Sequence, residues 1–225
     1  MKLFEFLIAL SLMLMLFSFP SIRANHSLES AYKSLATHIR ATQLAALSDD
    51  VVLTQLESAR DLLKFYPSIN ALALMQQHHN AMWQIQFHLG RIYTTFSYSI
   101  YADTPRHAIN TNFDSRPMAG DMILKNMDRK CLSAYNNTNT AQECKNNAQA
   151  EVRLGEYFGI EQMFLESDRF CKENGGGRIY FDRLGVPYCG KIPTPLQQPF
   201  KITLQKGKYT KSLCVMPKNG IIREC

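Results

Sequence analysis

The stretch NALALMQQHHNAMWQIQFHLGRIYTTFSYSIY, residues 70–101, has the most regular hydrophobic pattern in the chain. Intervals of three and four alternate through the series Leu72, Met75, His79, Met82, Gln86, Leu89, Tyr93, Phe96 and Ile100. This spacing is typical of a helix that packs lengthwise against other helices. It predicts one long helix from about Asn70 to Tyr101. His79 and Gln86 would then either hydrogen-bond a neighbouring helix and set its register, or form a polar partner site.

Two further helices are predicted before this stretch. Apolar residues at helical spacing from Leu28 to Ala46 predict the first. Ser48, with the two aspartates that follow it, predicts the start of the second, because a serine cap and early acids satisfy free backbone N–H groups. Pro67 predicts its end. Together the three helices predict a long-helix bundle over residues 25–101.

The pattern changes after this bundle. Residues 102–116 show no periodicity and contain Pro105, so we expect a loop that separates two domains. A fourth helix is predicted from Pro117 to about Tyr135, and a fifth from the capping box Thr140–Glu143 to about residue 171. Short β runs follow at 178–182, 186–189, 201–205, 213–216 and 221–223, with an Asn-Gly hairpin signal at 219–220. The predicted fold is mainly α, with a disulfide-stabilised α+β region over residues 117–225.

All cysteines of the chain lie in this last region: Cys131, Cys144, Cys171, Cys189, Cys214 and Cys225. An even number of cysteines in an exported chain indicates disulfides. We expect sequential pairing. The first two flank an Asn/Thr turn at equal distances, the next two join a helix end to the first hairpin, and the last two straddle the Asn-Gly turn. A zinc site is disfavoured because no two cysteines are two to four residues apart.

Residues 1–24 have the features of a signal peptide. Lys2 precedes an apolar run at 6–19, Pro20 ends that run, and Ala24 occupies a suitable cleavage position. The alternative is an uncleaved anchor, but the run is short for a bilayer span of ~20 residues. We therefore expect a periplasmic or secreted protein that retains no stable transmembrane anchor after cleavage.

The formal net charge is +6, and the basic excess lies towards the C-terminal end. One interpretation is an ordinary solvated face. The other is contact with an anionic surface or polymer, for which the candidates are Lys201, Lys206, Lys208, Lys211, Lys218 and Arg223. Nucleic acid is disfavoured as a partner because the chain is expected to leave the cytosol.

The sequence contains no local catalytic signature. The serine-hydrolase elbow Gly-x-Ser-x-Gly and the zinc-protease motif His-Glu-x-x-His are absent. Glu161, Glu166 and Asp168 could supply the paired carboxylates of a glycosidase, but a solvated helix face explains them better. We therefore expect no catalytic residue, no cofactor and no metal ligand.

Four short segments carry a resemblance to a known family: Cys131-Leu132-Ser133, Glu143-Cys144, Tyr157-Phe158-Gly159-Ile160 and Phe170-Cys171. Over about forty residues this region resembles the exported conjugal-transfer proteins of the TrbM type, which have no counterpart of the chain's front half. The resemblance implies a bacterial envelope setting.

These observations favour an exported, non-enzymatic binding or structural protein. It would serve an envelope secretion or conjugation assembly, or contact a host surface, with another protein or an anionic polymer as its partner. The alternative is a secreted hydrolase whose catalytic residues are dispersed in the sequence. A concave pocket that collects His, Asp, Glu or Ser would favour the enzyme, and an exposed apolar or basic face would favour the binding protein.

Overall fold

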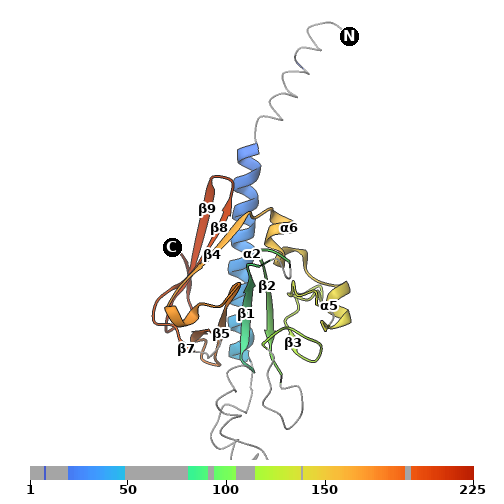
Figure 1. The fold of residues 1–225 in the computed structure, drawn as a ribbon, viewed down its shortest axis with the longest axis vertical. Coiled ribbons are helices and arrows are strands. Elements are labelled where there is room, and N and C mark those ends of the chain that lie inside the picture. The colour runs from blue at the N-terminus through green and yellow to red at the C-terminus, as the bar shows by residue number, and fades with distance from the viewer. Residues whose placement is uncertain are drawn as a thin grey trace, which may run out of the picture.

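The computed structural model describes residues 8, 20–48, 81–90, 94–104, 115–137, 139–190 and 194–225, with only the backbone given for residues 20–26. In this part of the chain one long helix, α2 (Pro20–Ser48), packs against two antiparallel sheets. The remaining α-helices are single turns, α5 (Gln142–Asn146) and α6 (Leu154–Phe158) (Figure 1). The predicted mainly α fold with a long-helix bundle is therefore wrong, because the described residues form mostly β structure.

The larger sheet has six strands in the order β3-β2-β1-β5-β6-β7. Their bounds are β1 Trp83–His88, β2 Ser97–Ala102, β3 Met122–Ile123, β5 Gly176–Phe181, β6 Pro187–Cys189 and β7 Thr194–Pro195. The central strand β1 pairs with β2 on one side, placing Ile85 opposite Ile100. On the other side it pairs with β5, which places Ile85 opposite Ile179. Strands far apart in the sequence therefore form the middle of this sheet.

The smaller sheet has four strands in the order β10-β9-β8-β4. Their bounds are β4 Gln162–Glu166, β8 Phe200–Lys206, β9 Tyr209–Val215 and β10 Ile222–Glu224. Strands β8 and β9 form a hairpin with Phe200 opposite Val215. The short strand β10 returns along β9 and lies at one edge of the sheet. The predicted β runs at 178–182, 186–189, 201–205, 213–216 and 221–223 are thus confirmed as parts of strands.

Helix α2 joins the two sheets through a shared core. Its buried residues Leu28, Leu35 and Ile39 belong to the same hydrophobic cluster as Phe87 of β1 and Leu213 of β9. The helix runs along the length of the body, and its N-terminal end extends past the β8–β9 hairpin (Figure 1). The first predicted helix, with its apolar spacing from Leu28 to Ala46, is confirmed. Whether residues 25–101 and 117–225 fold as separate domains remains a prediction.

The predicted helix at 70–101 is wrong wherever the structure describes it, since this region forms β1 and β2. Ile85 and Phe87 alternate with Gln84 and Gln86, so that one face of the sheet meets α2. A strand of six residues shows the alternation of apolar and polar residues over a short stretch only. In this region the longer series of apolar residues spaced by three and four was therefore the more conspicuous pattern, and it predicted a helix. Phe96, an interior position of the predicted helix, has φ 51 just before β2. Residues 49–80, including the second predicted helix, lie outside the described residues.

The predicted helices at 117–135 and 140–171 are also wrong as continuous elements. Residues 124–134 form a hairpin beside β2, in which the Leu132 N–H donates to Leu124 O and the Ile100 N–H donates to Leu132 O. Only α5 and α6 within 140–171 are helical, and α5 begins after Ala141 without the side-chain cap expected from Thr140. Gly159, at φ 68, ends α6 in the left-handed conformation that glycine adopts without strain. The chain then continues into β4.

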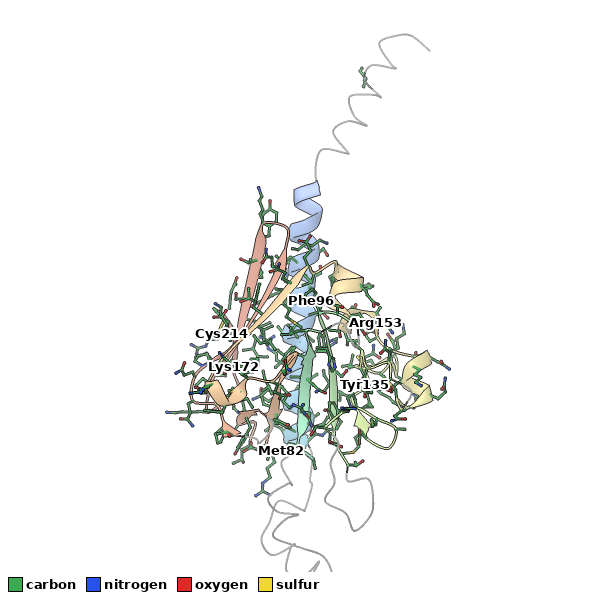
Figure 2. All side chains as sticks on the ribbon, in the orientation of Figure 1. Met82, Phe96, Tyr135, Arg153, Lys172 and Cys214 are labelled. Carbon is green, nitrogen blue, oxygen red and sulfur yellow. A yellow bond between two sulfur atoms is a disulfide. The ribbon has the colours of Figure 1, made fainter. Side chains whose placement is uncertain are left out.

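The sequential disulfide pairing is confirmed. The bonds join Cys131 to Cys144, Cys171 to Cys189, and Cys214 to Cys225. The first pair was expected to join two antiparallel helices across the Asn/Thr turn, and this premise is wrong, because Cys131 lies in an extended segment. The reason given for the last pair holds, since these cysteines flank the turn between β9 and β10. Cys214 and Tyr135 appear on opposite sides of α2 in Figure 2.

Within the residues that the structure describes, no helix is both long enough and apolar enough to cross a membrane.

Candidate interaction surface

Helix α2 buries one face and exposes the opposite one. Its exposed residues recur at intervals of four and three: Lys33, Thr37, Arg40, Leu44 and Leu47. This spacing places them along one side of the helix. We call these five residues the outer stripe. Its first part is basic and polar, and its second part is apolar.

A groove of about 400 Å³ lies between the outer stripe and strand β10. Its lining comes from α2 (Tyr32, Lys33, Ala36, Thr37, Arg40) and from β10 (Ile222, Arg223, Glu224). We call this feature the α2–β10 groove. Buried Ala36 and Ile222 make part of its lining apolar, while the basic residues Lys33 and Arg40 line it from the helix.

Lys211 of β9 ties the two walls of this groove together. Its ammonium contacts a carboxylate oxygen of Glu29 on α2 at 2.5 Å and one of Glu224 on β10 at 3.6 Å. It also lies 4.9 Å from the ring centroid of Tyr32, in cation–π geometry. The hydrogen bond from Lys211 lowers the pKa of Glu29, so this carboxylate stays ionised near neutral pH. Lys211 therefore links the helix wall of the groove to its strand wall.

Gln43 fastens the C-terminal part of α2 to two turns. Its side-chain amide donates hydrogen bonds of 2.9 Å to the carbonyls of Gly185 and Asn219, in the two turns that follow β5 and β9. Gly220 has φ 65, and a Cβ there would lie 2.5 Å from Gln43 Nε2, so this close approach requires glycine. Beside these contacts large apolar side chains remain exposed at Leu44, Leu47, Leu184 and Ile221.

A buried polar cluster lies on the larger sheet, around Arg178 of β5. Its guanidinium donates two hydrogen bonds to the Glu173 carboxylate, at 2.6 and 2.8 Å, and both side chains are almost fully buried. It also lies 3.4 Å from Gln84 Oε1 and from the Ser115 carbonyl. This arrangement fastens the segments around residues 115 and 173 to the sheet, which is a structural role.

Buried titratable groups near Arg178 are held in their neutral forms. Burial raises the pKa of Tyr180 to about 12 and that of Tyr101 well above its usual value. Burial, reinforced by the positive charge of Arg178, lowers the pKa of His88 to about 4. A general base or acid works best with a pKa near the working pH. None of these three groups is therefore tuned for proton transfer at neutral pH.

A second cavity, of about 200 Å³, lies where β5 approaches β4 and β8, close to the Cys171–Cys189 disulfide. Ser167, Asp168 and Glu173 line it, and none of its lining residues is a histidine. The Asp168 carboxylate accepts the backbone N–H groups of residues 197 and 198, and Glu173 is bound to Arg178. A serine nucleophile needs an adjacent base. This cavity does not supply one from the described residues.

The six basic residues proposed for anionic contact are distributed over β8, β9, β10 and their turns, and several of them are engaged within the protein. Lys201 pairs with Glu166 at 3.3 Å, and the Lys206 ammonium donates to the Phe158 carbonyl at 2.6 Å. Lys208 lies over the Tyr209 ring, and Lys218 adopts φ 71 in the β9–β10 turn. Lys211 and Arg223 belong to the α2–β10 groove or its support. Anionic contact by the full set remains a prediction.

Sequence reasoning missed the part that α2 contributes to this surface. Tyr32, Lys33 and Arg40 come from a segment in which only the apolar positions were interpreted. The residues of the outer stripe also repeat at intervals of four and three, and this second pattern could have revealed the stripe. The partner wall, β10, could not have been assigned to it, because nothing local links residues 32–40 to 222–224.

Comparison with known proteins found no match: no family model, no curated protein and no solved structure is similar to this chain. The similarity of residues 131–171 to TrbM-type proteins therefore rests on the quoted residues alone. Among the described residues, no group of His, Cys, Asp and Glu side chains could hold a metal ion.

Proposed function

We propose that this chain is an exported, non-enzymatic binding protein that serves as a structural component of a cell-envelope assembly. It docks onto another protein through the α2–β10 groove and the adjoining outer stripe. The observation that supports this proposal best is the groove itself, which is concave and is bordered by exposed apolar and basic side chains. Exposed faces of this mixed kind are typical of protein-binding sites.

The covalent structure supports the proposed compartment. Three disulfides and the lack of a membrane-crossing helix among the described residues are consistent with an extracellular or secreted protein. In the proposal residues 1–24 direct export and are removed after Ala24. The described side-chain contacts of α2 begin at Ser27, whose hydroxyl donates to the Phe158 carbonyl at 2.6 Å. Cleavage at Ala24 leaves this contact intact.

The alternative, a secreted hydrolase, receives less support from the same structure. The cavity near Cys171 holds a serine without a neighbouring histidine, and its carboxylates are engaged by backbone N–H groups or by Arg178. The buried cluster around Arg178 holds neutral phenols and a neutral imidazole. These groups lack the paired acid and base that hydrolysis requires.

The proposal can be tested in the cell that makes the protein. The full chain would carry a photo-crosslinking amino acid at Thr37, in the groove, or at the exposed control position Tyr157 on α6. We expect a defined protein adduct from Thr37 and none from Tyr157. Equal adducts from both positions, or none from either, would show that the groove is not the docking surface. Sequencing the N-terminus of the isolated protein should return Asn25 as its first residue.

A further inference from the structure

We infer that the α2–β10 groove binds an extended, acidic peptide segment of a partner protein, which adds as a strand to the free edge of β10. This inference rests on the proposed docking function and names the chemistry of the partner. Its basis is an unpaired strand edge and uncompensated basic side chains at the same groove.

The edge of β10 is open within the described part of the chain. Among the described strands, β10 pairs with β9 alone and ends the strand order of its sheet. Its inward bonds run from the Met216 N–H to Ile221 O and from the Cys225 N–H to Ser212 O. Because backbone groups alternate between the two sides of an antiparallel strand, the N–H and C=O groups of Ile222 and Glu224 point away from β9. They form the pairing edge that strand addition uses.

The groove offers an apolar contact beside this edge. Ile222 pairs with Val215, a buried core residue that belongs to the cluster packed on α2, so the Ile222 side chain points towards the helix. Buried Ala36 and partly buried Tyr32 line the groove from the helix. Alternate side chains of an added strand would point towards these residues, and the others would point to solvent. An apolar–acidic alternation fits this surface.

The charges around the groove select an acidic partner. Arg40 lines it from α2 and makes no ion pair within the described part of the chain, while Arg223 alternates with Ile222 and directs its side chain to the other face of β10. Lys33 pairs with Glu29 at 3.4 Å, but its side chain is still 71% exposed. The nearby acids, Glu29 and Glu224, are both engaged by Lys211. Opposite charges at the rim favour association and disfavour like-charged partners.

An anionic membrane is the competing partner for these basic residues. It is less well suited, because a flat lipid surface offers no partner for the outward backbone groups of β10. Two of the basic residues near the C-terminal end are also engaged within the protein, Lys201 by Glu166 and Lys206 by the Phe158 carbonyl.

The test is an NMR titration of the exported, disulfide-intact protein with three synthetic hexapeptides. The first alternates glutamate with valine, the second has lysine in place of glutamate, and the third is the first with N-methylated backbone nitrogens. We expect saturable shifts of the Ile222 and Glu224 amide signals with the first peptide only. Binding to the lysine peptide or to the N-methylated peptide with equal affinity would overturn the inference, and so would no binding of the first.

Matched variants locate the contact. Glu224→Pro removes an outward N–H, whereas Glu224→Ala removes the same carboxylate and keeps that N–H, and proline is tolerated at edge strands. We expect at least tenfold weaker binding for Glu224→Pro than for Glu224→Ala. Arg40→Glu should weaken binding about tenfold, while Arg169→Glu, an exposed control in the 3₁₀ turn Arg169–Cys171, should leave it unchanged. Equal binding by the two Glu224 variants would exclude strand addition.

Two further outcomes separate the possible failures. In the first, vesicles of anionic phospholipid bind the protein more tightly than the acidic peptide does, and Arg40→Glu abolishes this binding. That result would overturn the inference in favour of a membrane. A protein adduct at Thr37 without any peptide binding would refute strand addition and leave the docking surface standing. If neither an adduct at Thr37 nor peptide binding is observed, the proposed function is refuted as well.

Discussion

His88 offers the sharpest quantitative prediction, because it is a buried imidazole whose pKa is strongly displaced. Its side chain lies at the end of β1, where Nε2 is 3.3 Å from Ser99 Oγ. Burial, and secondarily the positive charge of Arg178, lowers its pKa from 6.5 to about 4. Below pH 6.5 the unfolded chain therefore binds a proton that the folded protein does not bind. The free energy of unfolding must fall as the pH drops from about 6.5 towards about 4.

The size of this effect follows from the displacement of the pKa. The full shift corresponds to about 3 kcal/mol, since one pKa unit is worth 1.36 kcal/mol. Between pH 7 and pH 4.5 the expected loss from His88 alone is about 2 kcal/mol. The variant His88→Gln keeps a neutral polar side chain near Ser99 and cannot titrate, so it should lose about 2 kcal/mol less than the parent over the same interval.

Urea unfolding at the two pH values measures this difference. Trp83, the single tryptophan, begins β1 and reports the transition by its fluorescence. All other titratable groups are the same in both proteins, so their contributions cancel in the comparison. An equal loss of stability in parent and variant would refute the argument, because it would mean that His88 ionises in the folded protein as it does in the unfolded chain.

Three more outcomes follow from the packing. Glu173→Gln leaves the buried Arg178 charge without its carboxylate and should cost about 3–5 kcal/mol in the free energy of unfolding by urea. Gly176→Ala places a methyl group against the Phe87 carbonyl and should cost about 1–3 kcal/mol, whereas Gly90→Ala, which meets no neighbour, should change stability by less than about 0.5 kcal/mol. Reducing the disulfides, each worth ~3 kcal/mol for loops of this length, should lower the melting temperature and make residues 117–225 the first region cut by protease.

Local signals in the sequence were sufficient for several elements. The apolar spacing from Leu28 to Ala46 spans several turns and correctly identified α2. The Asn219-Gly220 signal placed the turn before β10, and the positions of Cys214 and Cys225 on either side of that turn gave their pairing. In each case the interacting residues lie close together in the chain, so the pattern itself contains the information.

The strands of the larger sheet depended on partners that are remote in the sequence. Trp83 of β1 lies opposite Phe181 of β5, and the register of this pair is set by the burial of Ile85 and Ile179 against α2. A six-residue segment such as β1 carries too few residues for its period to decide between helix and strand. Cross-strand pairing and burial against the core decided it instead.

By itself, the sequence determined the helix from Leu28 to Ala46, the disulfide framework and the final hairpins, because these features arise from neighbouring residues. Only the tertiary structure decided that residues 83–102 are strands and that Tyr32 and Arg40 share a groove with Ile222 and Arg223. That groove exists because α2 and β10 pack against the same strand, β9, although about 180 residues separate them. Contacts at such separation depend on the packing of the whole chain, which no local pattern records.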